Sequence, residues 1–215
     1  MKRMNNTQAA VVDKELVLGG KVHGVTYDGK LVWYASDDAI VGVDEATESV
    51  VRRLSVPAQA GTAFDGTHLY QIADKKILVV DPSDGRVVRE LPAPAKSGNT
   101  GLAYGDGYLF VGDYKDGRIH KIDAKTGEVT KTLSSDRWVT GVSFVDGALW
   151  HATGNDGKGP EIRRVAEDGT VEEVLEVEGV EQIGGLEADG KGGFWCAGEA
   201  GKLRHISRKK KNAER

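Results

Sequence analysis

The chain has 215 residues, of which 39% are hydrophobic and 29% are charged, and its net charge is −4. This composition is typical of one globular domain and excludes an intrinsically disordered chain. No apolar run approaches the roughly 18 residues of a membrane-spanning helix, and the beginning of the chain lacks the apolar segment of a signal peptide. The single cysteine, Cys196, cannot form an internal disulfide. We therefore expect a cytoplasmic protein that does not bind membranes.

A strand-like segment, residues 8–20, is followed by five related units. Each unit opens on a glycine, and these glycines recur at intervals of 37 to 44 residues: Gly24, Gly61, Gly101, Gly141 and Gly185. Repeats of this length are typical of propeller blades or solenoid coils.

Each unit predicts four β-strands, which in the first unit read GVTYDG, LVWYAS, AIVGVD and SVVRRLSV. Apolar residues alternate along these segments, and an Asp-Gly pair separates the first two strands of every unit, where a tight hairpin needs residues that tolerate positive φ. No window has the apolar spacing of a long helix, so we expect almost no helix.

The two ends of the chain predict how the repeat closes. The fifth unit ends after GKLRHIS, before a fourth strand, and QAAVVDKELVLGG near the N-terminus has the apolar spacing of the missing strand. Pairing the two would close a ring and cover its edges. The sequence therefore predicts an all-β, five-bladed β-propeller of four-stranded antiparallel blades, with the last blade closed by the N-terminal strand.

This single domain would span residues 1–207, and residues 208–215 would form a basic disordered tail. The tail has no aromatic side chains that could stack on bases, so we expect no nucleic-acid partner.

One aromatic residue occupies the same place in the second strand of every unit: Trp33, Tyr70, Phe110, Trp150 and Trp195. Because all five units share it, the position predicts packing between blades, with a ligand-stacking platform as the alternative.

Positions at which one unit departs from the others are candidates for function. Two residues after the opening glycine, four units carry small residues, whereas the fifth carries Glu187. A carboxylate near the central channel requires a cation or hydrogen-bond donors, or its pKa rises. Glu187 is either a functional carboxylate or a structural one bound to neighbouring backbone amides.

Residues just before each opening glycine should cluster at one mouth of the channel, where His23 is a candidate general base or metal ligand. His151 and Cys196 follow the aromatic position, where either side chain could face the channel. A nucleophilic role for Cys196 is disfavoured because no partner base is identified. We expect further pocket residues near the unit starts: Asn99, Thr100, Thr140, Trp138 and Asp136.

The sequence contains no Walker loop, no H-E-x-x-H, no G-x-S-x-G and no paired cysteines for zinc. Nucleotide hydrolysis, zincin proteolysis and serine-hydrolase chemistry are therefore not leading candidates.

The stretch VHGVTYDGKLVWYAS resembles a blade of the virginiamycin B lyase family. The same blade pattern is shared by the gluconolactonase and regucalcin-like lactonases, by the glutamine cyclotransferases and by non-catalytic propellers. Resemblance to the lyases implies a divalent metal with an acidic ligand and a histidine base, and the matching positions are Glu187, His23 and His151. Resemblance to the cyclotransferases implies a channel carboxylate that shuttles a proton.

Three functions remain open from the sequence. The first is a monomeric enzyme in which Ca²⁺ or Mg²⁺, held by Glu187 and Asn99, assists hydrolysis or elimination that opens a lactone- or ester-type ring of a small-molecule substrate, with His23 or His151 taking the proton. The second is a metal-free cyclotransferase with Glu187 as acid and base. The third is a non-catalytic propeller that binds a ligand or protein.

Overall fold

The computed structural model describes residues 6–95, 98–114, 116–154 and 156–209, which form twenty β-strands and one short 3₁₀-helix, Glu199–Gly201. The predicted near absence of helix is confirmed for these residues. No helical segment in this part of the chain has the length and apolar character needed to cross a membrane.

The strands form three four-stranded sheets and one eight-stranded sheet. The first sheet has the order β2 (Val25–Tyr27), β3 (Leu31–Ser36), β4 (Ala39–Asp44), β5 (Ser49–Leu54). The second has the order β6 (Thr62–Phe64), β7 (Leu69–Ala73), β8 (Lys76–Val80), β9 (Val87–Pro92). The third has the order β10 (Asn99–Gly105), β11 (Tyr108–Asp113), β12 (Arg118–Asp123), β13 (Val129–Ser134). The eight-stranded sheet has the order β14 (Val139–Val145), β15 (Ala148–Thr153), β16 (Glu161–Val165), β17 (Val171–Glu178), β1 (Thr7–Val17), β20 (Lys202–Arg208), β19 (Phe194–Ala197), β18 (Leu186–Ala188).

The hairpin turns follow the Asp-Gly pairs of the sequence. Asp106 and Gly107, between β10 and β11, have φ values of +53° and +82°, the left-handed region that a two-residue hairpin requires. In the first sheet the Asp28 carboxylate instead accepts hydrogen bonds from the backbone N–H groups of Lys30 and Leu31, at 2.8 and 2.6 Å. Local turn chemistry therefore sets the register of each hairpin.

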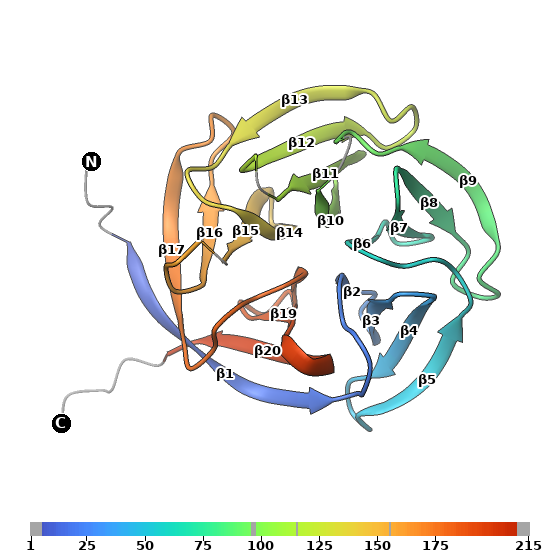
Figure 1. Cartoon of the computed structure of the whole chain (residues 1–215), viewed down its shortest axis with the longest axis horizontal. Helices are drawn as coiled ribbons and strands as arrows, with labels where there is room; N and C mark the ends of the chain where they lie inside the picture. Colours follow the sequence, from blue (N-terminus) through green and yellow to red (C-terminus); the bar gives the residue numbers. More distant parts are fainter. Residues whose placement is uncertain (1–5, 96–97, 115, 155, 210–215) are drawn as a thin grey trace.

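The sheets are arranged around a common centre, with the first strand of each unit innermost and the fourth outermost (Figure 1). The five opening glycines form a closed ring at this centre. A Cβ added to Gly61 would lie 2.6 Å from the carbonyl oxygen of Thr100, and one added to Gly185 would lie 2.6 Å from the carbonyl oxygen of His23. Each glycine thus packs directly on the backbone of the next unit, and the fifth returns to the first.

The N-terminal strand closes the last unit, as the sequence predicts. β1 pairs antiparallel with β20 from Ala10↔Arg208 to Val17↔Lys202. The expectation of separate four-stranded sheets differs from the structure, because the other end of β1 also pairs in parallel with β17, from Thr7↔Val174 to Val11↔Glu178. The 11-residue β1 is long enough to reach both neighbours, so the fourth and fifth units share one eight-stranded sheet.

The described chain also extends beyond the expected domain end at residue 207. Strand β20 includes Arg208, and the backbone N–H of Lys209 donates to the carbonyl oxygen of Ala9 at 2.8 Å. The remainder of the expected tail, residues 210–215, lies outside the described residues.

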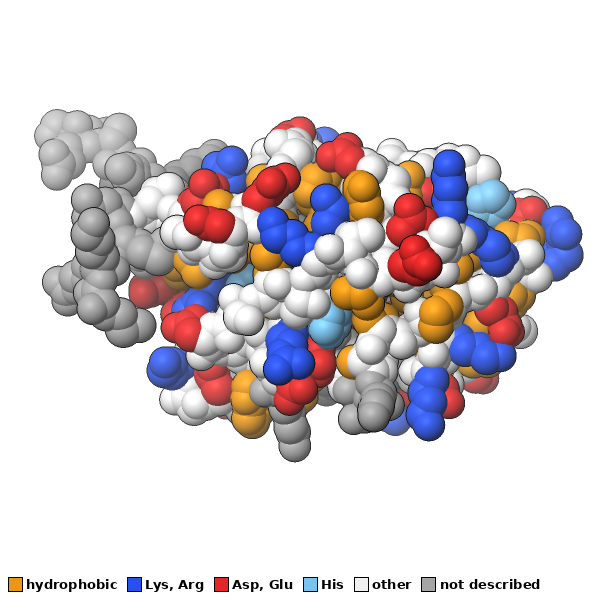
Figure 2. All heavy atoms as spheres, turned by 90° about the horizontal axis from the view of Figure 1, so that it is seen from above, with side chains coloured by type: hydrophobic (Ala, Val, Ile, Leu, Met, Phe, Trp, Pro, Cys, Tyr) orange, Lys and Arg blue, Asp and Glu red, His pale blue; other side chains and the backbone are white. Residues whose placement is uncertain are grey.

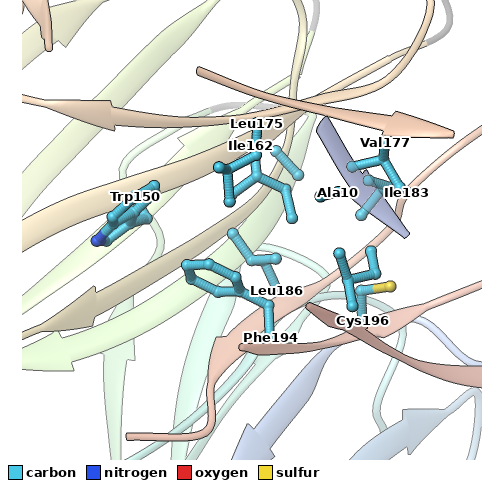
Figure 3. Close-up of a cluster of buried hydrophobic side chains, with 11 residues drawn as sticks. Ala10, Trp150, Ile162, Leu175, Val177, Ile183, Leu186, Phe194 and Cys196 are labelled. Atoms are coloured by element: carbon cyan, nitrogen blue, oxygen red, sulfur yellow. The ribbon is translucent and has the colours of Figure 1, made fainter. Parts of the chain in front are cut away.

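The core consists of apolar clusters between neighbouring units. Figure 3 shows the cluster between the fourth and fifth units, in which Trp150 and Phe194 have ring centroids 5.1 Å apart and lie with Ile162, Leu175 and Leu186. The other four repeated aromatic residues likewise lie in clusters with side chains of the following unit. The predicted role of this aromatic position in packing is therefore confirmed.

Charged side chains of both signs are interspersed over the side of the molecule in Figure 2. This distribution agrees with the small net charge of −4.

Candidate functional site

A pocket of about 260 Å³ lies at one end of the ring axis, immediately before the ring of glycines. We call it the mouth pocket. The residues that precede the five glycines all line it, as the sequence predicts: His23, Ala60, Thr100, Thr140 and Gly184. Amide and hydroxyl groups dominate its polar lining, which also includes Gln59, Asn99, Tyr114 and Gln182.

His23, which lines this pocket, pairs with Asp37, which is not itself part of the lining. Its Nε2 lies 2.8 Å from Oδ1 of Asp37, and Lys21 Nζ lies 3.2 Å from the other carboxylate oxygen. The hydrogen bond with His23, followed by that with Lys21, lowers the pKa of Asp37. An ionised carboxylate only accepts hydrogen bonds, so Nε2 of His23 carries the proton and Nδ1 of a neutral ring is left as the acceptor.

The backbone holds both members of this pair. His23 donates its N–H to the carbonyl oxygen of Ala35 and accepts from Gly185 N–H, each at 3.0 Å. Asp37 has a φ of +47°, an uncommon value for a non-glycine residue, and its carbonyl oxygen accepts from Ala58 N–H at 2.7 Å. The tight β3–β4 turn is therefore fixed by the segment that connects the first unit to the second, and the carboxylate is hydrogen-bonded to His23.

Comparison of the repeats did not identify Asp37. The second unit has Asp74 at the same distance from its opening glycine, also at positive φ, so Asp37 is no exception to the repeat. The difference lies in the partner, because the second unit has Ala60 where the first has His23. The pair could have been found in the sequence by searching for the one unit that carries both a histidine before the opening glycine and an aspartate at this position.

The predicted pocket residues Asn99, Thr100 and Thr140 differ in whether their polar side-chain atoms already have hydrogen-bond partners. The Asn99 amide is engaged by the backbone of Ala95, donating at 2.9 Å and accepting at 3.2 Å. Thr100 Oγ1 donates to the carbonyl oxygen of Val139 at 3.0 Å. By contrast, the buried Oγ1 of Thr140 has no hydrogen-bond partner among the described residues. This hydroxyl is therefore an unsatisfied polar group buried in the wall of the pocket.

Two aromatic side chains stand at one side of the pocket. Tyr114 lines it, and Trp138 packs against Tyr114 with ring centroids 5.0 Å apart at an angle of 52°. Trp138, predicted from the sequence as a pocket residue, thus contacts the lining without being part of it.

Glu187 and the mouth pocket lie on opposite sides of the ring of glycines. Glu187 is two residues after Gly185 on β18 and is not part of the pocket lining. The residue is partly buried. No hydrogen bond joins its carboxyl group to a described residue. Desolvation alone raises its pKa well above the usual value. The structural alternative, a carboxylate bound to backbone amides, is therefore not what the described residues show.

Replacing Glu187 by glutamine is expected to stabilise the protein at alkaline pH. Because the folded state binds this proton more tightly than the unfolded chain, wild-type stability falls as pH rises from the unfolded pKa through the higher folded one. The Glu187→Gln variant lacks this pH-dependent loss of stability. It should melt about 2–4 °C higher than wild type at pH 8 but no higher near pH 4. Thermal melts of both proteins across this range provide the measurement. A variant that is less stable than wild type at pH 8 would show that the carboxylate is structural.

His151 and Asp136 belong to a different place, between the third and fourth units. They line a separate cavity of about 450 Å³ with Arg163, whose guanidinium bonds the Asp136 carboxylate at 2.5 Å. Burial, followed by the nearby Arg163, lowers the pKa of His151 to about 4. The structure therefore does not bring either residue to the mouth pocket. The buried Cys196 lies in the core, where desolvation raises its pKa to about 12.

The expected metal ligands do not converge. Asn99 is two residues before Gly101 and Glu187 two residues after Gly185, so the ring of glycines separates them by four residues along the strands, roughly 13 Å. Among the described residues, no three His, Cys, Asp or Glu side chains are grouped as metal ligands. Asn99 and Glu187 as placed do not form one coordination sphere, which requires every ligand oxygen at about 2.0–2.6 Å from the ion.

No protein-family model matches this sequence, and no curated protein shows significant similarity to it. Solved structures do resemble the fold. The crystal structure of Myxococcus xanthus glutaminyl cyclase has a TM-score of 0.72 at 14% identity, covering 94% of this chain and 97% of that chain. A streptogramin B lyase structure has a TM-score of 0.56 at 14% identity, covering 91% and 97% of the two chains. The WD40 β-propeller domain of Doa1 has a TM-score of 0.58 at 17% identity, covering 88% of this chain and 64% of that chain. The chain therefore has the β-propeller fold, with the mouth pocket at one end of its axis.

Proposed function

We propose that the chain is a five-bladed propeller whose fourth and fifth blades are joined through β1 and β17. Two observations support this count. Each half of the eight-stranded sheet has the strand order of a complete unit, β14 to β17 and β18 to β20 with β1. The ring of opening glycines also closes after five members.

We further propose that the mouth pocket is the active site of an acyl-transfer enzyme acting on a small amide substrate. The observation that carries this proposal is the His23–Asp37 pair, 2.8 Å apart, at a pocket whose polar lining consists mainly of amide and hydroxyl groups. A histidine oriented by a carboxylate is the usual arrangement for moving a proton near neutral pH. The likeness to glutaminyl cyclase over nearly the full length of both chains makes cyclisation of an N-terminal glutamine the first reaction to test.

In this reaction His23 would move the proton twice. The free α-amine of the substrate attacks the γ-carbonyl carbon, and Nδ1 of His23 accepts the proton that the new C–N bond displaces. The same imidazolium then protonates the leaving nitrogen, so that a five-membered lactam and one ammonia are released. Asp37 would stabilise the imidazolium between these steps.

The test is ammonia release from a short peptide that begins with glutamine, compared with the same peptide beginning with asparagine. Glutamine closes a five-membered ring, whereas asparagine would require a strained four-membered one. Turnover of the glutamine peptide alone supports the proposal. Absence of ammonia and of a pyroglutamyl product at high enzyme concentration contradicts it.

Replacing His23 by alanine is expected to lower kcat by about 10²–10⁴, the usual contribution of a general acid–base group. Asp37→Asn should cause a smaller loss, because the imidazole is retained but loses its anionic partner. Both variants should melt close to wild type, since the two side chains are partly exposed. The measurement is steady-state kinetics beside a thermal melt, with Asp74→Asn as the matched control in the second unit. Full activity of His23→Ala would remove His23 from the mechanism.

A second candidate is the opening of a lactone- or ester-type ring with a divalent ion, favoured by the likeness to the streptogramin B lyase structure and by a Glu187 carboxyl group without a described hydrogen-bond partner. Lactone and cyclic ester substrates assayed with added Ca²⁺ or Mg²⁺ and with a chelator distinguish it from the first. Chelator-sensitive turnover that is lost in Glu187→Gln would establish this candidate. If neither substrate class turns over, both enzymatic candidates fail.

A further inference from the structure

A second pocket, of about 350 Å³, lies between the third and fourth units at the other end of their inner strands from the mouth pocket. We call it the hairpin pocket, because turn residues Asp106 and Gly147 line its rim. It is independent of the proposed active site, since the two pockets share no lining residue.

The floor of the hairpin pocket is aromatic. Phe110 and Phe144 stack with ring centroids 5.0 Å apart and an interplanar angle of 9°. The Phe144 ring occupies the space that a side chain at position 105 would need, because a Cβ on Gly105 would overlap it. The first two units have an aspartate at this position, and there the carboxylate accepts a hydrogen bond from the repeated aromatic residue, as Asp28 does from Trp33 Nε1 at 2.7 Å. The third unit has thus replaced this polar contact by a stacked pair of aromatic rings, of which Phe144 is partly exposed.

Two lysines stand directly opposite each other beside these rings. Lys121 of β12 pairs with Lys131 of β13, and both line the pocket. The Nζ of Lys121 lies 4.0 Å from the centroid of the Tyr108 ring and 5.7 Å from that of Phe110. No ion pair joins either lysine to a described residue. Like charges directly opposite each other on a sheet are destabilising, so a bound anion would relieve this repulsion.

In the fourth unit, the equivalent cross-strand pair contains a carboxylate in place of the second lysine. There Arg164 stands opposite Glu173, at the positions that Lys121 and Lys131 occupy in the third unit. Glu173 binds Arg208 at 3.0 Å, and the Arg208 guanidinium lies 5.6 Å from the centroid of the Trp150 ring. In the fourth unit, the cation beside the aromatic ring, Arg208, is therefore paired with a carboxylate of the protein, Glu173. In the hairpin pocket the position of Glu173 is occupied by a second lysine, Lys131.

The acidic residues of the hairpin pocket are either paired with an arginine or exposed to solvent. Glu172 lies 3.4 Å from Arg164 in an ion pair, and Asp106 and Glu167 are exposed to solvent. None of the three forms an ion pair with Lys121 or Lys131 in the described part of the chain.

We propose that the hairpin pocket binds a flat aromatic carboxylate. The aromatic ring of the ligand packs against Phe144, the more exposed member of the stacked pair, and the carboxylate accepts hydrogen bonds from Lys121 and Lys131. The ligand supplies the negative charge that Glu173 supplies in the neighbouring interface. Binding combines burial of the aromatic face with two charge-assisted hydrogen bonds.

The test uses 2-naphthoate and its neutral analogue 2-naphthalenemethanol, titrated by calorimetry at low salt. Wild type should bind 2-naphthoate with a Kd of about 1 mM or below and the alcohol at least about tenfold more weakly. Absence of naphthoate binding in the millimolar range, or equal affinity for the alcohol, overturns the proposal.

The decisive variant is Lys131→Glu, which copies the pairing of the fourth unit. It should lower the affinity for 2-naphthoate at least about tenfold and raise the melting temperature by about 1–2 °C, because an attractive cross-strand pair replaces a repulsive one. The matched control is Arg52→Glu, which makes the same charge change at the equivalent exposed position of the first unit. The control should keep wild-type affinity. Equal losses in both variants, or none in Lys131→Glu, would place the binding elsewhere.

Discussion

Removal of residues 1–18 is expected to abolish cooperative folding, although the segment precedes the first repeat. The deletion takes away all of β1, and with it the backbone pairing to β20 and to β17. It also removes Leu16 and Ala10 from two core clusters, and burial of one leucine side chain alone contributes about 1.5–3 kcal/mol. The freed edges of β17 and β20 would then be open to pairing with other chains.

Size-exclusion chromatography and a thermal melt of residues 19–215 measure this effect. The expected result is aggregation or a broad transition without a folded baseline. A control deletion of residues 1–5 leaves β1 intact and should melt like the full chain. If residues 19–215 melted within a degree or two of the full-length protein, closure of the ring by β1 would not be required for folding.

Replacement of Gly61 by alanine is expected to cost about 3 kcal/mol of unfolding free energy, toward the upper end for overpacking of a core. The new Cβ would lie 2.6 Å from the carbonyl oxygen of Thr100, so the inner strands of the second and third units would have to separate. That movement is opposed because Gly101 packs in the same way on the fourth unit. The strain therefore spreads around the ring, whereas a surface substitution would be absorbed locally.

The expected fall in melting temperature is roughly 6–12 °C for a chain of this size. Gly159→Ala is the matched control, because its φ lies outside the left-handed region and no atom lies within 4 Å of the added Cβ. It should change stability by no more than about 0.5 kcal/mol. Similar melting temperatures for the two variants would contradict the role of Gly61 in the ring.

The repeat in the sequence was sufficient to predict the strands, their turns and the closing strand. These features depend on local chemistry: alternation with period two forms strands, Asp-Gly pairs form tight hairpins, and a missing fourth strand has one counterpart at the other end of the chain. The repeated aromatic residues were also predictable as packing residues, because a need shared by five units is structural. The clustering of His23, Thr100 and Thr140 at one mouth followed from the same alignment.

Tertiary structure decided which of the exceptional residues meet. The turn after β3 brings Asp37 to His23, and the glycine ring puts Glu187 on the opposite side from Asn99. The packing of neighbouring units places Lys121 and Lys131 beside the stacked rings of Phe110 and Phe144, and the length of β1 joins two units into one sheet. A repeat specifies the position of each residue within its own unit. Contacts that are particular to one pair of units depend on how the units curve into a ring and on the shapes of side chains far apart in the chain, and the repeat does not encode these.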